Sequence, residues 1–426
     1  MELEIPEMLA AVLQGQVGAQ SPLGQQLSGY GAGNGVRTVS SQHYDGDSLN
    51  LLFQLGMGAG ARDLVFQLLA LDNLNGESLA RPIPSLELMV PALIEWFKRD
   101  LIDGWLYQRG KDGVLLPWLV HSVRLVKPAE GTAYVLVGLL ANTLQAAGRE
   151  PPSEPRLRFS GMTWGLSFYA EDLPGRTLAG LFADHGFHKE CPEFKREYEA
   201  QLERFTRLQP QFGAQFTIGG NAWTASEGPR AALECHRLPE GSSVRCVNDE
   251  ALLQRRFDLA ADPHYWRESG IATAFDRIPQ HCYLHLFHLD WHRNVWVHAQ
   301  HVQEYEYQPG LRERLVLPQA HRDLIDILTA DRNFLVEDVV PGKSGGTTIL
   351  CKGAPGLGKT LTAEVYAEVV GKPLYRVHSG QLGVTASSVE ASLTQILQRA
   401  ARWDCVLLLD EADVYIRRRG DGLQHN

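Results

Sequence analysis

A glycine-rich segment with one lysine and one threonine is the first part of this sequence that could do chemistry. Gly353 is followed by four residues and then by Gly358, Lys359 and Thr360, after the apolar run "TTILC" and before a helical pattern. This order of strand, glycine-rich turn and helix is typical of a phosphate-binding P-loop. Glycines let backbone N–H groups approach phosphate oxygens, and the helix N-terminus adds a partial positive charge. The pattern predicts a nucleotide-binding loop over residues 353–361.

The side chains of this loop have distinct predicted roles. Lys359 is expected to reach the β- and γ-phosphates and to assist catalysis, and Thr360 is expected to place its hydroxyl on Mg²⁺. The predicted nucleotide-binding set is Gly353, Ala354, Pro355, Gly356, Leu357, Gly358, Lys359, Thr360 and Leu361. The expected cofactors are ATP and Mg²⁺.

A second chemical signature ends an apolar run near the C-terminus. The segment "CVLLLDE" (405–411) is continuously apolar up to Asp410 and Glu411, as expected for a parallel strand covered on both faces. Ligands of α/β sheets bind at the carboxyl ends of such strands. Asp410 is therefore predicted to hold Mg²⁺, and Glu411 is predicted to orient and deprotonate an attacking water. Loop and acidic pair together predict ATP hydrolysis.

The segments around the two signatures alternate between strand and helix patterns. A strand is predicted at 347–351, a helix from the loop to Gly371, a strand at 373–377 and a helix at 387–403. Residues 311–426 are therefore predicted to form an α/β domain, a partial P-loop NTPase with a parallel sheet.

The rest of the chain divides by composition and periodicity. Residues 1–50 are rich in Gln, Gly and Ser, which predicts a flexible arm in which only a short helix near 5–14 could form. Residues 51–310 mix helical stripes with short apolar runs, which predicts an α+β region of one or two domains that recognises a substrate or partner. A helix is expected at 191–208, with an apolar stripe of Phe194, Tyr198, Leu202 and Phe205.

Composition argues against several classes of protein. The formal net charge is −10 at pH 7, which argues against a DNA-binding surface. The start "MELEIPE" lacks a signal-peptide pattern, and apolar stretches such as 134–140 are far shorter than the roughly 18 residues that span a bilayer. The six cysteines contain no C-x-x-C pair and are predicted to be reduced thiols. A cytoplasmic protein is expected.

Two further motifs invite more specific interpretations. Residues 281–301 are rich in histidine, but their spacing matches no pair of zinc ligands, so a β-hairpin turning at "WHRN" is favoured over a metal site. Residues 410–413 read "DEAD", as in one helicase family, but further helicase motifs are not found and the distance from the P-loop is short. Both segments are therefore better explained without a metal or a helicase.

The stretches "GAPGLGKTLTAE" and "LLLDEAD" resemble those of AAA-family ATPases, and the resemblance covers about residues 315–426. The chain is most similar to AAA proteins that carry a large N-terminal region. The resemblance implies a nucleotide loop at Gly353, Gly358, Lys359 and Thr360, a metal-binding acid at Asp410 and a hydrolytic acid at Glu411. It further implies a homo-hexamer that uses ATP to remodel a protein partner.

Two departures from the family pattern are visible. Many members carry an aromatic residue in a pore loop, but residues 380–385 read "GQLGVT". After Glu411 the family has a fourth strand, an arginine finger and a helical lid, whereas Arg417, Arg418 and Arg419 come too early for the finger and are interpreted as a solvated charge run. We therefore expect a chain that holds the N-terminal region and the first half of the ATPase module, and that is inactive alone. The alternative is a non-catalytic nucleotide-responsive or partner-binding protein.

Overall fold

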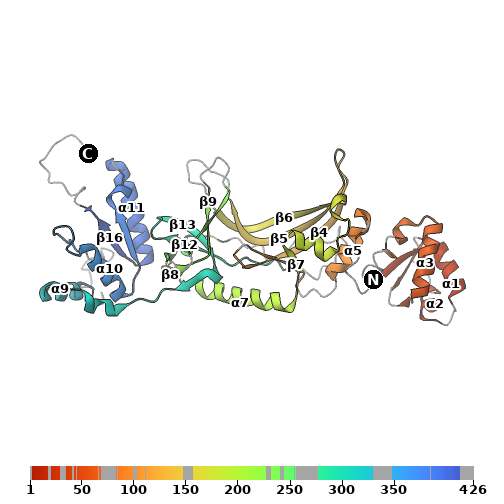
Figure 1. The fold of residues 1–426 in the computed structure, drawn as a ribbon, viewed down its shortest axis with the longest axis horizontal. Helices are drawn as coiled ribbons and strands as arrows, with labels where there is room; N and C mark the ends of the chain where they lie inside the picture. Colours follow the sequence, from red (N-terminus) through yellow and green to blue (C-terminus); the bar gives the residue numbers. More distant parts are fainter. Residues whose placement is uncertain are drawn as a thin grey trace, which may run out of the picture. The chain divides into compact units, whose positions relative to one another are not determined.

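A computed structural model of the chain describes residues 2–17, 21–28, 35–40, 43–44, 46–65, 67–68, 83, 85–98, 103–110, 112–146, 157–226, 232–239, 244–253, 255, 277–329, 348–383 and 385–412 (Figure 1). Arg417, Arg418 and Arg419 lie outside these residues. The chain divides into two compact units, one of residues 1–147, 157–202 and 255–281, the other of residues 148–156, 203–254 and 282–426. The predicted α+β region 51–310 therefore contributes to both units. Within the described residues, no helix is both long and apolar enough to cross a membrane.

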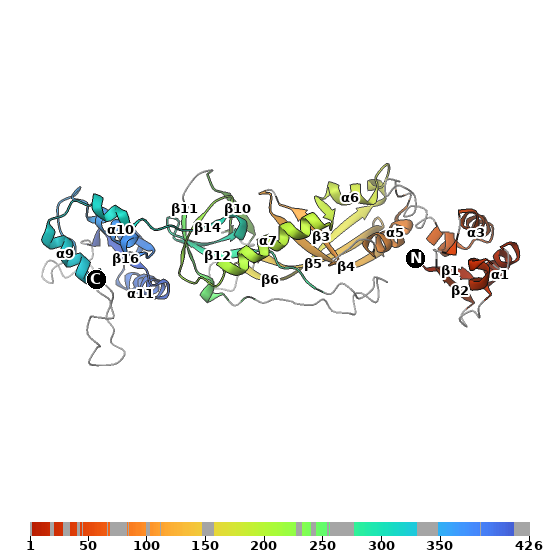
Figure 2. The ribbon, with the colours of Figure 1, turned by 90° about the horizontal axis from the view of Figure 1, so that it is seen from below.

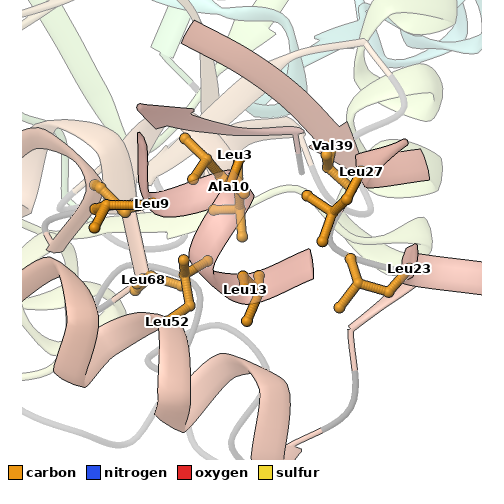
Figure 3. Close-up of a cluster of buried hydrophobic side chains, with 11 residues drawn as sticks. Leu3, Leu9, Ala10, Leu13, Leu23, Leu27, Val39, Leu52 and Leu68 are labelled. Carbon is orange, nitrogen blue, oxygen red and sulfur yellow. The ribbon is translucent and has the colours of Figure 1, made fainter. Parts of the chain in front are cut away.

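The N-terminal part of the first unit is built around a core of aliphatic side chains (Figure 3). Its elements are β1 (Glu2–Pro6), α1 (Glu7–Gln16), α2 (Pro22–Leu27), β2 (Val36–Ser40) and α3 (Gly46–Gly58). β1 and β2 pair antiparallel. Leu3 and Ile5 alternate on β1 and are fully buried, while Leu9 and Leu13 lie one helical turn apart on α1 and point into the same core. Ser21 caps α2, because its Oγ accepts the Gly24 N–H at 2.9 Å.

This packing corrects the flexible arm predicted for residues 1–50. Over the described part of that stretch, the sparse leucines and isoleucines follow strand and helix periods and bury one another, although the average composition is polar. The same core includes Leu52, Leu64 and Leu68, so a boundary at residue 50 would divide α3 and its core. The flexible arm was predicted from the average composition, which does not reveal a short amphipathic pattern of a few apolar residues.

The first unit also contains an antiparallel sheet in the order β6-β5-β4-β3-β7. Its strands are β3 (Trp105–Arg109), β4 (Leu115–Val126), β5 (Tyr134–Ala146), β6 (Leu157–Tyr169) and β7 (Phe187–Lys189). Helix α5 (Leu86–Lys98) contacts β4 and β5, and α6 (Leu178–Asp184) contacts β7. The rings of Trp96 and Phe97 on α5 pack against Phe182 on α6, with centroids 5.2 and 5.7 Å from it. Aromatic burial therefore holds the two helices together.

The predicted amphipathic helix is α7 (Pro192–Leu208), which begins in the first unit and ends in the second. Pro192 occupies its first turn, where a missing N–H costs no hydrogen bond. Tyr198 and Phe205 of the predicted stripe are buried. The helical period of the sequence thus correctly identified the buried face of this helix.

The second unit contains an antiparallel sheet in the order β10-β9-β13-β12-β11-β8-β14, which we call the β8–β14 sheet (Figure 2). Its strands are β8 (Gln215–Ile218), β9 (Asn221–Ala225), β10 (Leu233–Arg237), β11 (Val244–Asn248), β12 (Tyr283–His288), β13 (Arg293–His298) and β14 (Val302–Glu304). β12 and β13 form the hairpin predicted from "WHRN", with His288 paired to Arg293 at the turn. Both strands are largely buried, as their apolar residues require.

The C-terminal elements of the second unit form a mixed α/β structure with a parallel strand pair. They are α9 (Gln319–Thr329), α10 (Lys359–Val370), β15 (Leu374–His378), α11 (Ala386–Trp403) and β16 (Val406–Asp410). β15 and β16 pair parallel, with His378 opposite Asp410. Tyr375 and Val377 of β15 share a core with α11, whereas Arg376 between them approaches α10. Because side chains alternate along a strand, α10 and α11 cover opposite faces of this pair (Figures 1 and 2).

The predicted strand at 347–351 differs from the structure. Residues 348–351 form no strand, and the Leu350 side chain is 79% exposed. β-propensity expresses how well a residue fits beside a neighbouring strand, and within the described residues β16 pairs with β15 alone. The apolar run is therefore present without the pairing that would make it a strand.

One core joins the β8–β14 sheet to the C-terminal elements. It consists of Val247, Phe287, Leu289, Tyr375, Val377, Leu382, Ile396, Ala400 and Trp403. The Phe287 ring lies 4.9 Å from that of Trp403 and 5.6 Å from that of Tyr375. The Arg399 guanidinium lies 4.3 Å over the Phe287 ring, a cation–π contact. The sheet and the parallel strand pair are thus parts of one packed body.

Candidate functional site

The glycine-rich loop turns into α10 through residues in left-handed backbone conformations. Gly356 has φ of 79° and Gly358, the N-cap of α10, has φ of 76°. A Cβ added at either glycine would meet nothing within 4 Å, so the backbone angle and not space requires glycine here. α10 begins at Lys359, as the motif predicts. Its first turn therefore presents free backbone N–H groups at the loop.

Lys359 lies folded over the loop. Its Nζ donates hydrogen bonds to the carbonyl oxygens of Gly353 at 3.0 Å and Ala354 at 2.9 Å. Other loop residues are open to solvent: Leu357 is 67% exposed and Leu361 is 53% exposed. Pro355 and Gly356 are exposed as well. A cation beside an exposed, glycine-shaped turn at a helix N-terminus suits an anionic ligand.

The structure brings together the two side chains predicted to hold a metal. Thr360 Oγ1 donates to Asp410 Oδ2 at 3.3 Å, although the two residues lie on α10 and at the end of β16. Mg²⁺ is usually bound by one or two protein oxygens, with phosphates and waters completing the octahedron. A hydroxyl and a carboxylate at this distance fit that pattern. Within the described part of the chain, no larger cluster of His, Cys, Asp or Glu could hold a metal.

Glu411 follows Asp410 in a sharp turn. It is exposed, its φ is 58°, and its backbone N–H donates to Asp410 Oδ1 at 3.2 Å. A non-glycine residue in this region is uncommon and is often found where function fixes the backbone. The Asp410 side chain thus points toward Thr360, while Glu411 is exposed after the end of β16.

Sequence analysis missed Arg376, which also contacts Asp410. Arg376 Nη2 lies 2.8 Å from Asp410 Oδ2, and Nη1 lies 4.0 Å from Glu364 Oε1 on α10. The available signal was a charged residue inside the apolar run "PLYRV". Its partner could not be identified, since the parallel register of β15 and β16 brings them together.

The end of α10 away from the loop is anchored to the segment that follows β14. Glu368 is buried, and its carboxylate accepts the Tyr305 hydroxyl at 2.6 Å and the Gln308 backbone N–H at 2.9 Å. Arg245 of β11 approaches the same carboxylate at 3.9 Å. Burial and the bond to Glu368 raise the pKa of the Tyr305 hydroxyl. These contacts fix the helix at one end while its loop end stays exposed.

One residue of the histidine-rich hairpin, His288, closes its turn. His288 Nδ1 accepts the backbone N–H groups of Asp290 and Trp291, both at 3.2 Å, and its ring stacks on Trp291 at 4.0 Å. Burial lowers the pKa of His288 to about 4. His288 is therefore a neutral imidazole that accepts the two backbone N–H groups of the turn.

Comparison with known proteins finds a family match in the C-terminal part of the chain. Residues 349–426 match the model of the family described as "ATPase family associated with various cellular activities (AAA)". An uncharacterized AAA family ATPase, y4kL, of Sinorhizobium fredii is 40% identical over 79 residues, which cover 17% of this chain and 23% of the relative. The ATP-dependent zinc metalloprotease FtsH of Veillonella parvula is 36% identical over 80 residues, which cover 18% and 12%.

A third relative matches over a longer stretch. The Lon protease of Leptospira interrogans is 29% identical over 112 residues, which cover 24% of this chain and 13% of the relative. The chain thus spans less than a quarter of the length of each of these curated relatives. No solved structure matches.

Proposed function

Because residues 349–426 belong to the AAA family of ATPases, we propose that this protein binds ATP with Mg²⁺ and couples its hydrolysis to remodelling of a protein partner. The observation that carries the proposal is the approach of Thr360 and Asp410 to 3.3 Å beside the glycine-shaped start of α10. That approach joins the P-loop to the acidic end of β16, and an ATPase needs both.

The residues of the loop divide the work of binding. Backbone N–H groups between Gly353 and Leu361, except at Pro355, would cradle the phosphates, with the helix N-terminus adding partial positive charge. Lys359 would exchange its carbonyl partners, Gly353 and Ala354, for β- and γ-phosphate oxygens. Thr360 and Asp410 would hold Mg²⁺, which when bound neutralises charge on the phosphates.

Glu411 is the proposed general base. Its carboxylate is exposed beyond the end of β16, while the Asp410 side chain is held at Thr360. Glu411 would accept a proton from the water that attacks the γ-phosphorus. The two acids thereby have separate tasks, one in metal binding and one in proton transfer.

The remaining regions would supply the partner and the assembly. The β8–β14 sheet shares a core with β15 and α11. This shared core supports a role for the sheet in coupling the binding of a partner to the nucleotide site. We assign partner recognition to the region before residue 311, and a homo-hexamer to the complete protein by analogy with the family.

Binding of a fluorescent ATP analogue to the purified chain tests the proposal. Wild type should bind in Mg²⁺, and Lys359→Ala should lose binding, since it removes the lysine charge at the loop. Lys372→Ala is the matched control, because Lys372 pairs with Asp404 at 2.7 Å beyond the far end of α10. Equal binding by wild type and Lys359→Ala would refute the site. The chain alone is expected to be inactive under either candidate, so ATP turnover by the complete protein separates the ATPase from the alternative, a nucleotide-responsive protein that does not hydrolyse ATP.

A further inference from the structure

Arg376 forms an ion pair with Asp410, the carboxylate that the proposed function assigns to a metal. Its Nη2 lies 2.8 Å from Asp410 Oδ2, the same oxygen that accepts the Thr360 hydroxyl at 3.3 Å. A charge-assisted hydrogen bond of this length is stronger than one between neutral groups. One oxygen of Asp410 is therefore already shared between a cation and a hydroxyl.

The surroundings of Arg376 are those of a guanidinium that can change partners. Its side chain is 42% exposed, and its second nitrogen lies 4.0 Å from Glu364 on α10, at the limit of an ion pair. Its Nε is buried without a hydrogen-bond partner. The contact with Asp410 is thus the one close ion pair of Arg376 among the described residues. A partly exposed pair of this kind contributes little stability.

The position of Arg376 on β15 determines which groups its charge can act on. Arg376 is on β15, two residues before His378, which pairs with Asp410 across the parallel strands. It faces α10 and Thr360, the side on which phosphates would lie. Its charge therefore acts on the carboxylate and on the proposed phosphate position together.

We propose that Arg376 is a positioning residue that substitutes for Mg²⁺ at Asp410 when no metal is bound. It holds the carboxylate against Thr360 and leaves Oδ2 when the metal arrives. The proposal rests on the proposed function, because it requires the same loop to bind ATP with Mg²⁺. Two effects on binding follow, and they have opposite signs.

With the metal present, Arg376 competes for Asp410 and weakens Mg²⁺ binding. Without the metal, Arg376 offsets the negative charge of Asp410 and makes metal-free ATP binding less unfavourable. Removal of the Arg376 charge should therefore lower the Mg²⁺ concentration needed for half-maximal binding of the nucleotide. It should also weaken nucleotide binding in EDTA. A residue that served only to hold β15 beside β16 would change stability and leave both binding quantities alone.

The test uses the full chain and a fluorescent ATP analogue titrated with Mg²⁺ or held in EDTA. Arg376→Gln should lower the Mg²⁺ concentration at half-maximal binding by about three- to fivefold, the range for one partly exposed ion pair. Its affinity in EDTA should fall by a similar factor. Arg376→Lys keeps the charge, and because Arg376 contacts Asp410 through Nη2 and not as a two-pronged fork, this variant should stay within about twofold of wild type in both measurements. Lys372→Ala again removes a paired cation away from the site.

The outcomes separate this inference from the proposed function. Opposite shifts in Arg376→Gln, restored by Arg376→Lys, support the inference. A Gln variant that binds the analogue with unchanged Mg²⁺ and EDTA dependence overturns it and leaves the nucleotide site standing. Absence of binding by wild type overturns both. Thermal unfolding identifies a Gln variant that has lost its fold, in which case the Lys variant decides: a shift beyond about threefold would exclude a charge-based role, given that charge is retained.

Discussion

Asp249 and Trp403 share a hydrogen bond in which Trp403 Nε1 donates to Asp249 Oδ1 at 2.8 Å. Arg402 donates to the same oxygen from Nε at 3.2 Å and from Nη2 at 2.8 Å. The Asp249 side chain is completely buried. Because Asp249 follows β11 and Trp403 ends α11, one carboxylate oxygen ties the β8–β14 sheet to α11.

Asp249→Ala should destabilise the second unit by about 2–4 kcal/mol, since it leaves the buried Trp403 donor without an acceptor and removes the partner of the partly exposed Arg402. Urea unfolding followed by tryptophan fluorescence measures the loss. Lys372→Ala removes the cation from the exposed pair with Asp404 and should cost less than about 1 kcal/mol. Equal losses in the two variants would contradict the coupling through Asp249.

In the complete protein, Glu411→Gln should keep nucleotide affinity and lower ATP turnover by about 10²–10⁴-fold, because the amide retains shape but cannot accept the proton. Phosphate release under single-turnover conditions measures this against wild type. Glu390→Gln, on the exposed side of α11, provides the control. Turnover within about threefold of wild type would reject Glu411 as the base, given the usual size of that effect.

His281 is a buried histidine of the first unit whose two ring nitrogens are both bonded. Nε2 lies 3.0 Å from the Pro117 carbonyl oxygen, which can only accept, so Nε2 carries the proton. Nδ1 then accepts the Thr143 hydroxyl at 2.7 Å. Burial lowers the pKa of His281 to about 4 from its usual 6.5. The folded protein thus keeps this ring neutral where an unfolded chain would protonate it.

Stability of the first unit should therefore fall as pH decreases from about 6.5 to about 4, since the unfolded state binds more protons in that window. The contribution is complete above 6.5. Urea midpoints measured across this range test the slope. His281→Gln should be less stable at pH 7 and show a flatter pH dependence, whereas His321→Gln, exposed on α9, should match wild type. An identical slope in His281→Gln would assign the acid sensitivity to other groups.

Tyr305→Phe should destabilise the second unit by about 1 kcal/mol, the usual net value of one hydrogen bond, with somewhat more because Glu368 is charged. Hydrogen exchange of the α10 amides should accelerate toward the C-terminal end of the helix. Tyr307→Phe is the neighbouring control, since the Tyr305 hydroxyl and not that of Tyr307 bonds Glu368. Unchanged exchange in Tyr305→Phe would show that the Gln308 N–H alone holds the helix.

Local patterns predicted much of this fold. The stripe of α7, the hairpin of β12 and β13, and the strands that became β15 and β16 all follow from periods within one element. The start of α10 follows from the glycine-rich motif, because a left-handed turn before a helix needs Gly358. These features depend on neighbours in sequence, so one sequence suffices to find them.

Features that depend on distant partners could not be predicted. The strand order of the β8–β14 sheet places β14 beside β8 and β9 beside β13, and no local pattern specifies either pairing. Arg376 meets Asp410 only through the register of two parallel strands. The run at 347–351 satisfied every local criterion for a strand, yet its described residues have no partner. The β-propensity of a segment favours strand pairing, but a strand forms only where a neighbouring strand is available.

The anchoring of α10 at Glu368 gives the helix a pivot. Lys359 lies nine residues before Glu368, or about 14 Å along the helix axis at about 1.5 Å per residue. A tilt of about 5° around that pivot would displace the loop end by about 1 Å, a shift that can change a reaction rate by about 10²-fold. Any rotation of the segment at Tyr305 and Gln308 that tilts α10 would thus move Lys359 farther than it moves Glu368.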